Sequence, residues 1–424
     1  MKTSRLLSVA GAAILSSIPV QAASFHGLGF LAGGQSSWAR AVSADGMVVV
    51  GQSYITADLN PKSEAFRWTE AGGMVGIGFL TGGEDSGAIA VSGDGTTVVG
   101  FSSMLAGDPP QVSGWFGFRW TQTGGMSPIG LWYARGVSGD GSVVVGDGSG
   151  QNDPTQAYRW TAAGPEALGV LHGGSSSWAM AVSSNGLSVV GTSFTDLTPS
   201  GEQAFLWTAE KGMSALVGLP GTTLSEGNGI SADGSTVVGV CAGPEVTQAF
   251  RWTAAEGMTL LGTLPNGGNS TALAASGDGN IIIGFANTQY SEPFVWDITH
   301  GMRSLQGLLV EQHADLTGWS LDSALGISAD GRTLVGSGYH NGATEAWIAR
   351  VGDLTRPELS INLIAENLKI SWPGIKIAGQ LQVSPEPSGQ WTNVDATPVI
   401  TGNSQSVTLP VTDKAGFFRL IRLP

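Results

Sequence analysis

Hydrophobic and polar positions alternate in short stretches along most of the chain, and one arrangement of them returns many times. It is clearest in residues 41–74, which read AVSADGMVVVGQS, then a loop, then EAFRWTEAGGM. Runs of about four to eight residues rich in Val and aromatic side chains, bounded by Gly, Asn or Asp, are typical of β-strands joined by turns. The pattern therefore predicts an all-β chain.

A Ser-x-Asp-Gly turn recurs seven times, once with Asn in place of Asp. The third residue of these turns is Asp45, Asp94, Asp140, Asn185, Asp233, Asp278 and Asp330. An aromatic-x-Trp phrase such as Phe66-Arg67-Trp68 follows each of the first six turns, and Trp347 takes the aromatic place in an altered seventh copy. Successive turns lie 45 to 52 residues apart, a period expected of a propeller blade, a solenoid or another repeat array.

Two spacings inside each copy are fixed, and two others vary. The glycine of Val-Val-Gly lies 6 residues after the turn Asp or Asn in every copy, and a Met position follows the aromatic by 8 residues in six copies. Two tight turns thus join four strands. Asp-Gly between strands predicts a type I′ hairpin, in which both central residues take positive φ. In a four-stranded meander both variable connections lie at the same end, which favours a binding role for that end.

Seven such units predict a seven-bladed β-propeller over residues 23–355. The last copy ends after the strand that holds Trp347 and lacks a fourth strand. A strand with the character of the missing one stands before the first copy, at residues 25–31. We therefore expect the N-terminal strand to pair near Trp347 and to close the last blade.

The repeated phrases resemble those of a known family. SADGxxVVG, AFRWT and GGMxxLG are similar to the repeats of the HAF-repeat extracellular proteins of bacteria, and the segments at 316–331 and 345–350 resemble the family's closing repeat. The resemblance covers residues 25–355. It implies an extracellular bacterial protein, and it implies no particular biochemical activity.

The net charge of the chain limits the kinds of partner that it can bind, and its N-terminal segment predicts where the protein is located. The chain of 424 residues carries a formal charge of −14 and no basic run, which argues against a nucleic-acid partner. Residues 1–22 read as a secretory signal, with Lys2 and Arg5 before an apolar stretch and Ala22 at the cleavage site. No later apolar run approaches the ~20 residues of a membrane span. We expect a secreted, extracellular or cell-surface bacterial protein, the periplasm included, that is monomeric.

The repeats stop at Pro357. Residues 357–424 contain short alternating stretches that predict a small β-sandwich, and the segment resembles the C-terminal β module of exported bacterial proteins through its Phe-Phe-Arg-Leu phrase at 417–420. Within the repeats, residues 309–315 predict one or two helical turns.

Large aromatic residues that only some copies carry are the candidate ligand-binding residues. Trp38, Tyr133 and Trp178 stand seven residues before the turn, where other copies have Gly87 or Thr271. Further aromatics at the variable end are Tyr54, Trp115, Phe116, Phe194, Tyr290, Trp319 and Tyr339. Exposed aromatic rings suit a glycan or protein ligand, and the alternative is ordinary loop packing.

The sequence offers little catalytic chemistry. The turn Asp is a hairpin residue, Cys241 lies in an apolar strand without a neighbouring base, and the five His lack metal spacing. We predict no catalytic residue, no metal and no cofactor. The first hypothesis is an exported, non-catalytic binding propeller for a glycan or an extracellular protein. The alternatives are a secreted hydrolase or lyase with carboxylates at the propeller mouth, and a structural extracellular-matrix protein.

Overall fold

A computed structural model describes residues 23–422, except 57–60, 107–110, 149–154, 197–200, 245–246, 266, 288–289, 355–358, 365–366, 374–378, 387–388, 402–403 and 411–416. The predicted signal segment and Pro357 lie outside the described residues. The chain divides into two compact units. The larger takes in residues 21–297 and 301–354, and the smaller takes in residues 355–424.

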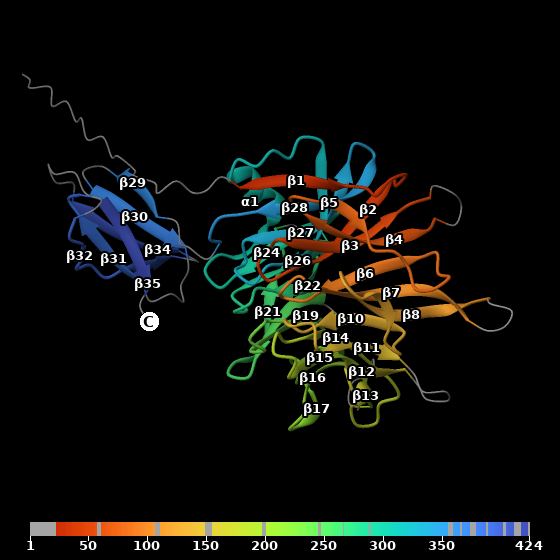
Figure 1. Ribbon diagram of the computed structural model, residues 1–424. Coiled ribbons are helices and arrows are strands. Elements are labelled where there is room, and N and C mark those ends of the chain that lie inside the picture. Colours follow the sequence, from red (N-terminus) through yellow and green to blue (C-terminus); the bar gives the residue numbers. More distant parts are fainter. Residues whose placement is uncertain are drawn as a thin grey trace, which may run out of the picture. The chain divides into compact units, whose positions relative to one another are not determined.

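The larger unit holds seven four-stranded antiparallel sheets among its described residues, here numbered I to VII in chain order (Figure 1). Sheet I consists of β2 (Ser36–Val42), β3 (Val48–Tyr54), β4 (Ser63–Thr69) and β5 (Gly73–Gly76). Sheet II consists of β6 (Ser86–Val91), β7 (Thr97–Ala106), β8 (Gln111–Thr121) and β9 (Gly125–Pro128). Sheet III consists of β10 (Tyr133–Val137), β11 (Val144–Gly148), β12 (Gln156–Thr161) and β13 (Gly164–Gly169).

Sheets IV to VI follow the same order. Sheet IV consists of β14 (Ser177–Val182), β15 (Ser188–Phe194), β16 (Glu202–Thr208) and β17 (Gly212–Ala215). Sheet V consists of β18 (Leu224–Ile230), β19 (Thr236–Ala242), β20 (Thr247–Thr253) and β21 (Gly257–Gly262). Sheet VI consists of β22 (Asn269–Ala275), β23 (Ile281–Asn287), β24 (Ser291–Asp297) and β25 (Gly301–Ser304). The predicted meander of four strands is thus present in each copy.

Sheet VII joins the two ends of the larger unit. Its strands β26 (Trp319–Ile327), β27 (Thr333–His340) and β28 (Ala343–Arg350) are completed by β1 (Ser24–Gly29). Phe25 lies opposite Ala349 and Gly27 lies opposite Trp347, as expected from the unpaired N-terminal strand in the sequence. Figure 1 shows β1 in red alongside β28 in blue.

The Ser-x-Asp-Gly turns differ from the predicted hairpin type. In sheet I, the Gly46 N–H donates to the Ser43 carbonyl at 2.9 Å, and Gly46 has a φ of 75°. The only non-glycine residues with positive φ in the described part of the chain are His313 and Asn341, so Asp45 is not left-handed. The type I′ prediction is therefore wrong: a β-turn over 43–46 ends on a left-handed glycine.

Hydrogen bonds within this turn explain its residue types. The Asp45 carboxylate accepts from the Ser43 hydroxyl at 2.5 Å and from the Met47 N–H at 3.0 Å. The Ser43 hydroxyl in turn accepts from the Val48 N–H at 2.9 Å. Asn185 makes the same two bonds in sheet IV, at 2.7 and 3.0 Å, so an acceptor is required there and a charge is not.

Backbone hydrogen bonds connect each turn to the turn of the next sheet. They span 2.8 to 3.2 Å and run from Ala44 N to Gly93 O, Asp94 N to Gly139 O, Gly139 N to Ser184 O, Ser184 N to Ala232 O, Asp233 N to Gly277 O, Gly277 N to Ala329 O, and Ala329 N to Ala44 O. The seventh bond returns to the first turn. The seven turns therefore form one continuous hydrogen-bonded circuit.

Aromatic side chains fill the space between neighbouring sheets, as the sequence predicts. Phe66, Phe118, Phe205, Phe250 and Phe294 are fully buried, and Trp347 occupies the corresponding place in sheet VII. Phe66 and Trp68 pack in one cluster with Val335 and Ile348 of sheet VII, so the first and last sheets share a core. Each buried Phe contributes roughly 1.5–3 kcal/mol of transfer free energy.

The glycine of Val-Val-Gly is required by a close backbone approach. In each sheet the first strand contains a β-bulge, and the carbonyl two residues before the bulged residue lies against the glycine of the second strand. A Cβ on Gly51 would lie under 3.0 Å from the Trp38 carbonyl oxygen, and the same holds for Gly100, Gly146, Gly191, Gly239, Gly284 and Gly336 with their own partners. No larger residue fits these seven positions without moving backbone.

One helix lies in the connection between sheets VI and VII, four residues earlier than predicted. α1 spans Leu305–Glu311, and the Ser304 hydroxyl caps it by accepting from the Gly307 N–H at 3.0 Å. Leu305, Leu308 and Leu309 are its buried residues. His313, with a φ of 62°, ends the helical conformation, so the predicted extension to residue 315 is wrong.

The smaller unit contains two sheets. One consists of β29 (Ser360–Ile364), β30 (Asn367–Pro373), β34 (Ser404–Pro410) and β33 (Val399–Thr401). The other consists of β32 (Thr392–Asn393), β31 (Gly379–Ser384) and β35 (Phe417–Arg422). Ile370, Trp372 and Val407 of the first sheet share a hydrophobic core with Leu381 of the second.

Candidate functional site

The two ends of the larger unit's sheets differ in kind. The turns between first and second strands, and between third and fourth strands, lie at one end and are short. The connections from second to third strand, and from one sheet to the next, lie at the other end, here called the open end. All seven predicted aromatic residues are on strands at or near the open end.

Two pairs of these aromatics occupy equivalent places in sheets I and IV. The ring of Trp38 on β2 meets that of Tyr54 on β3 edge to face, with 5.3 Å between centroids. Trp178 on β14 meets Phe194 on β15 in the same way at 5.7 Å. All four side chains are half-buried. Each pair spans neighbouring strands of one sheet, where aromatic pairs add to the strands' association.

A third group joins sheets II and III through a residue that the sequence reasoning missed. Phe101 on β7 contacts Trp115 on β8 at 5.2 Å and Tyr133 on β10 at 5.5 Å. Trp115 is 40% exposed, and Tyr133 is half-buried. Phe101 directly follows the Val-Val-Gly glycine, where other copies carry Gln52 or Thr192. Its irregular occurrence at a repeat position is the signal that would have found it.

The remaining candidate, Trp319, lies in sheet VII. Its ring stacks on His340 at 4.3 Å and meets Phe25 of β1 edge to face at 5.0 Å. Among the described residues, no ring contact connects this group to the other three. The seven predicted residues therefore form four separate groups rather than one patch. The groups lie on sheets VII, I, II, III and IV.

The bulge in each first strand places one residue toward a central cavity. These bulged residues, skipped by the strand register, are Arg40, Ile89, Arg135, Met180, Asn228, Leu273 and Leu325. All seven line one cavity of about 330 Å³, bordered by the first strands of all seven sheets, here called the channel. The sequence reasoning missed them, although the position five before the turn residue varies in character from copy to copy.

Two of the channel residues are arginines, and one of them is paired. Arg135 forms an ion pair with Asp147 of β11, which is 3% exposed, and its guanidinium lies 5.2 Å from the centre of the Tyr133 ring. Burial raises the pKa of Asp147, and the charge of Arg135 opposes that shift. This cluster connects a predicted aromatic residue directly with the channel.

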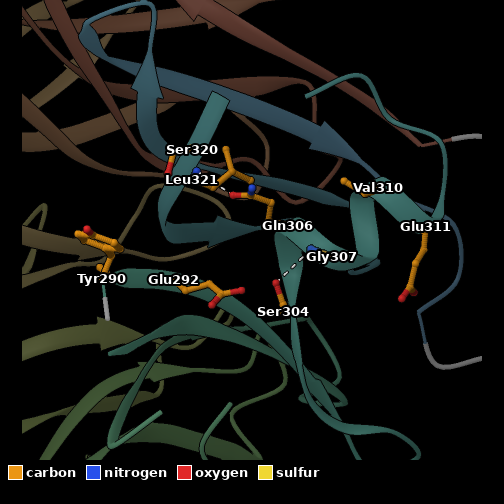
Figure 2. Close-up of a pocket in the computed structure, with 10 residues that line it drawn as sticks. Tyr290, Glu292, Ser304, Gln306, Gly307, Val310, Glu311, Ser320 and Leu321 are labelled. Carbon is orange, nitrogen blue, oxygen red and sulfur yellow. Dashed lines mark hydrogen bonds between the residues drawn. The ribbon is translucent and has the colours of Figure 1, made fainter. Parts of the chain in front are cut away.

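A second cavity, of about 560 Å³, opens between sheets VI and VII at the open end (Figure 2). Its lining includes hydroxyl, amide and carboxylate groups beside apolar surface and consists of Tyr290, Ser291, Glu292, Ser304, Gln306, Gly307, Val310, Glu311, Ser320 and Leu321. The Gln306 side-chain oxygen accepts from the Leu321 N–H at 3.1 Å, which fixes the amide across the cavity. Tyr290, named among the variable-end aromatics, is 76% exposed at its rim.

The described residues offer few groups for catalysis. Cys241 is fully buried, and burial raises the pKa of its thiol to about 11. The His340 imidazole is held by Glu345 at 2.7 Å, and no group of three His, Cys, Asp or Glu in the described part of the chain is arranged to bind a metal. Burial and the neighbouring charge of Glu202 raise the pKa of Glu226, which lies at the open end of sheet V. No helix of the described chain is long and apolar enough to cross a membrane.

Comparison with known proteins gives the fold. No protein-family model and no curated protein matches the chain. The β-propeller domain of the Trilobed protease from Pyrococcus furiosus matches 74% of this chain and 95% of its own length, with a TM-score of 0.50 and 8% identity. That domain is described as having an open velcro topology, whereas here β1 and β28 pair within one sheet.

Two further solved structures show weaker likeness. TolB from Acinetobacter baumannii matches 73% of this chain and 82% of its own, at a TM-score of 0.39 and 14% identity. A prolyl endopeptidase matches 81% of this chain and 55% of its own, at 0.47 and 12% identity. Among these similarities, the match to the protease domain is the one that identifies the fold: the repeats of this chain form a β-propeller.

Proposed function

We propose that this protein is an exported, non-catalytic binding protein of the HAF-repeat kind, in which a seven-bladed β-propeller presents its open end to a glycan or an extracellular protein. Each of sheets I to VII is one blade, β1 completes the last blade, and residues 357–424 form a small β-sandwich. The secretory signal at residues 1–22 directs the protein out of a bacterial cell. The closed circuit of seven turn-to-turn hydrogen bonds supports the seven-bladed reading.

The observation that carries the binding proposal is the placement of aromatic residues that the repeat does not need. Trp38 and Trp178 occupy a position where other blades fold with Gly87, Thr271 or Ser323. They, Tyr133 and their partners lie at the open end, which is also the end of the cavity at Tyr290, and Tyr133 contacts the channel residue Arg135. Aromatic rings with hydroxyl and carboxylate groups nearby suit the faces and hydroxyls of sugars and the side chains of proteins.

The alternative, a hydrolase or lyase, depends on acidic pairs at the open end. Glu202 and Glu226 are the pair whose charges interact, yet a glycosidase also requires a defined separation of its two carboxyl groups across the scissile bond. The binding proposal therefore comes first, and product release is monitored in its test.

A glycan and protein array on the full exported chain tests the proposal. The double variant Trp38→Ala/Trp178→Ala is expected to fold, because other blades lack these rings, and to lose at least about tenfold in affinity for any ligand found. Trp391→Ala in the smaller unit is the matched control and is expected to leave the ligand profile unchanged. An unchanged ligand profile in the double variant would mean that Trp38 and Trp178 serve only in packing. Release of a reaction product that depends on Glu226 would establish the enzyme alternative.

A further inference from the structure

We propose that the channel binds an anionic group of the ligand, a carboxylate or a phosphate, through Arg40 with Arg135 as the second cation. Both arginines are bulged residues of first strands, in sheets I and III, and both line the same cavity of about 330 Å³. The inference uses the proposed function only to say which molecule carries the anion; a small free anion would bind in the same place.

The fold does not require arginine at these positions. The equivalent bulged residues in other sheets are Ile89, Met180, Leu273 and Leu325, and those sheets keep the same register and the same hydrogen-bonded turns. A bulge re-aims a side chain out of the sheet, so its residue is free of the packing between neighbouring sheets. The folding of the sheets therefore does not explain the two arginines, and binding of a ligand in the channel does.

Charge within the channel is unbalanced. Apart from Arg40, Arg135 and Asn228, the lining consists of apolar side chains and glycine, and no acidic residue is part of it. Arg135 is partnered by Asp147, but Arg40 makes no ion pair within the described residues. The Arg40 side chain is exposed, so its guanidinium is accessible to a ligand that enters the channel. A guanidinium without an ion-pair partner offers its N–H donors to a carboxylate or phosphate, and such charge-assisted hydrogen bonds are stronger than neutral ones.

The surroundings also limit what can enter. The protein as a whole carries a formal charge of −14, so a general attraction of anions to its surface is absent, and binding must come from the local arginines. The channel of about 330 Å³ has room for a small anionic group, and Tyr133, whose ring lies 5.2 Å from the guanidinium of Arg135, is near enough to contact the rest of a ligand. The Asn228 side-chain amide donates to the Ala272 carbonyl at 3.0 Å, which holds this third polar channel residue in place.

Calorimetric titration of the full exported chain with inorganic phosphate, sodium acetate and neutral glycerol, at constant ionic strength, tests the inference. We expect saturable binding of at least one anion, at a Kd of about millimolar, and none of glycerol. The two anions distinguish a phosphate-bearing from a carboxylate-bearing ligand.

The repeats supply the matched variants. Sheet IV carries Met180 at the bulge and Thr192 opposite Trp178, so Arg40→Met with Gln52→Thr, and Arg135→Met with Asp147→Thr, transplant a combination that already exists in this chain. The Arg40 variant is expected to weaken anion binding at least about tenfold, and the Arg135 variant to weaken it less. Leu273→Met is the neutral control in the channel, and Arg40→Lys is expected to restore part of the binding.

The outcomes separate this inference from the proposed function. Loss of binding in the Arg40 variant, with normal binding in Trp38→Ala/Trp178→Ala, supports the channel site whatever the array finds. No anion binding at about ten times the expected Kd, or equal binding by wild type and both arginine variants, overturns it. If Arg40→Met fails to fold, Arg40→Gln takes its place: equal binding by wild type and Arg40→Gln, combined with loss in the Arg135 variant, would reassign the site to Arg135 and overturn the role of Arg40.

Discussion

The hydroxyl of Ser37 accepts a 2.9 Å hydrogen bond from the backbone N–H of Ala346, 309 residues later in the chain. The same hydroxyl donates to the Gly29 carbonyl at 2.7 Å, so one buried side chain connects sheet I with two strands of sheet VII. Ser86, Ser177, Ser225 and Ser270 each accept from the third strand of the preceding sheet in the same way. A repeated serine therefore fastens neighbouring sheets near the open end.

Ser37→Ala is expected to lower the free energy of unfolding by about 1–3 kcal/mol, because the N–H of Ala346 and the carbonyl of Gly29 lose their shared partner in a buried place. Denaturant unfolding followed by tryptophan fluorescence measures the change. Ser175→Ala, at an exposed serine, is the control and is expected to be neutral. Equal stability of the two variants would contradict a fastening role for Ser37.

Gly51→Ala is expected to destabilise the protein by at least about 2 kcal/mol, because the added methyl group meets the Trp38 carbonyl and backbone must move. Gly268→Ala is the matched change: Gly268 is exposed, an added Cβ has no neighbour within 4 Å, and its φ is not positive. Thermal unfolding of the two variants compares them. A Gly51 variant as stable as the Gly268 variant would remove the steric reason for the repeated glycine.

Cys241→Ser is expected to change stability by less than about 1 kcal/mol. Cys241 stands where Ser53, Ser102 and Ser193 stand in other sheets, and each of those hydroxyls accepts an N–H from a leucine, at 3.2, 3.1 and 3.0 Å. The thiol, buried and with its pKa raised to about 11, should react with a thiol reagent only after unfolding. Rapid modification of the folded protein would contradict a structural role.

Asp140→Asn is expected to lower stability slightly at neutral pH and to flatten its dependence on pH below about 4, because the ionised carboxylate's contribution is removed. Hydrogen bonds from the Ser142 backbone and from the Ser138 and Ser142 hydroxyls lower the pKa of Asp140 from 3.8 to about 2 in the folded protein. Since the folded pKa lies below the unfolded one, this contribution is present above about pH 4 and is lost as pH falls toward 2. Urea unfolding across that range measures it, and Asn185 shows that an amide fits the turn.

A chain ending at Leu354 is expected to keep the propeller's stability, whereas one ending at Gly352 should lose about 2–4 kcal/mol. Leu354 is 3% exposed in the core cluster that holds residues of sheet VII, and Arg303 donates to its carbonyl at 3.3 Å. Comparing the melting of the two truncated chains decides the matter. Identical melting would mean that Leu354 adds nothing.

Repetition made much of the fold predictable. The four strands of each copy and the pairing of β1 beside Trp347 follow from spacings that recur. A residue that recurs in every copy is one that the fold requires. Turn geometry was harder, since Asp-Gly fits more than one turn type, and the hydrogen bonds of Ser43 decide between them. The helix was predicted four residues too late. Its N-cap, Ser304, is also the last residue of β25, so no loop in the sequence separates the strand from the helix.

The candidate site was less predictable, because it depends on what the repeat leaves unspecified. The aromatic residues could be named from their irregular occurrence, but their pairing could not, since Trp38 and Tyr54 meet diagonally across strands. Arg40 and Arg135 were missed because the bulge alters the alternation of faces, and a strand read with period two places them on a sheet face.

The residue at the bulge varies in chemical character from one copy of the repeat to the next. The seven copies carry Arg, Ile, Arg, Met, Asn, Leu and Leu there, while the bulge itself and the hydrogen-bonded turn that follows it are kept in every copy. Natural variation could therefore alter the chemistry of the interior one repeat at a time, with no intermediate that endangers folding. The same independence would let an engineer compose a chosen lining from seven single substitutions.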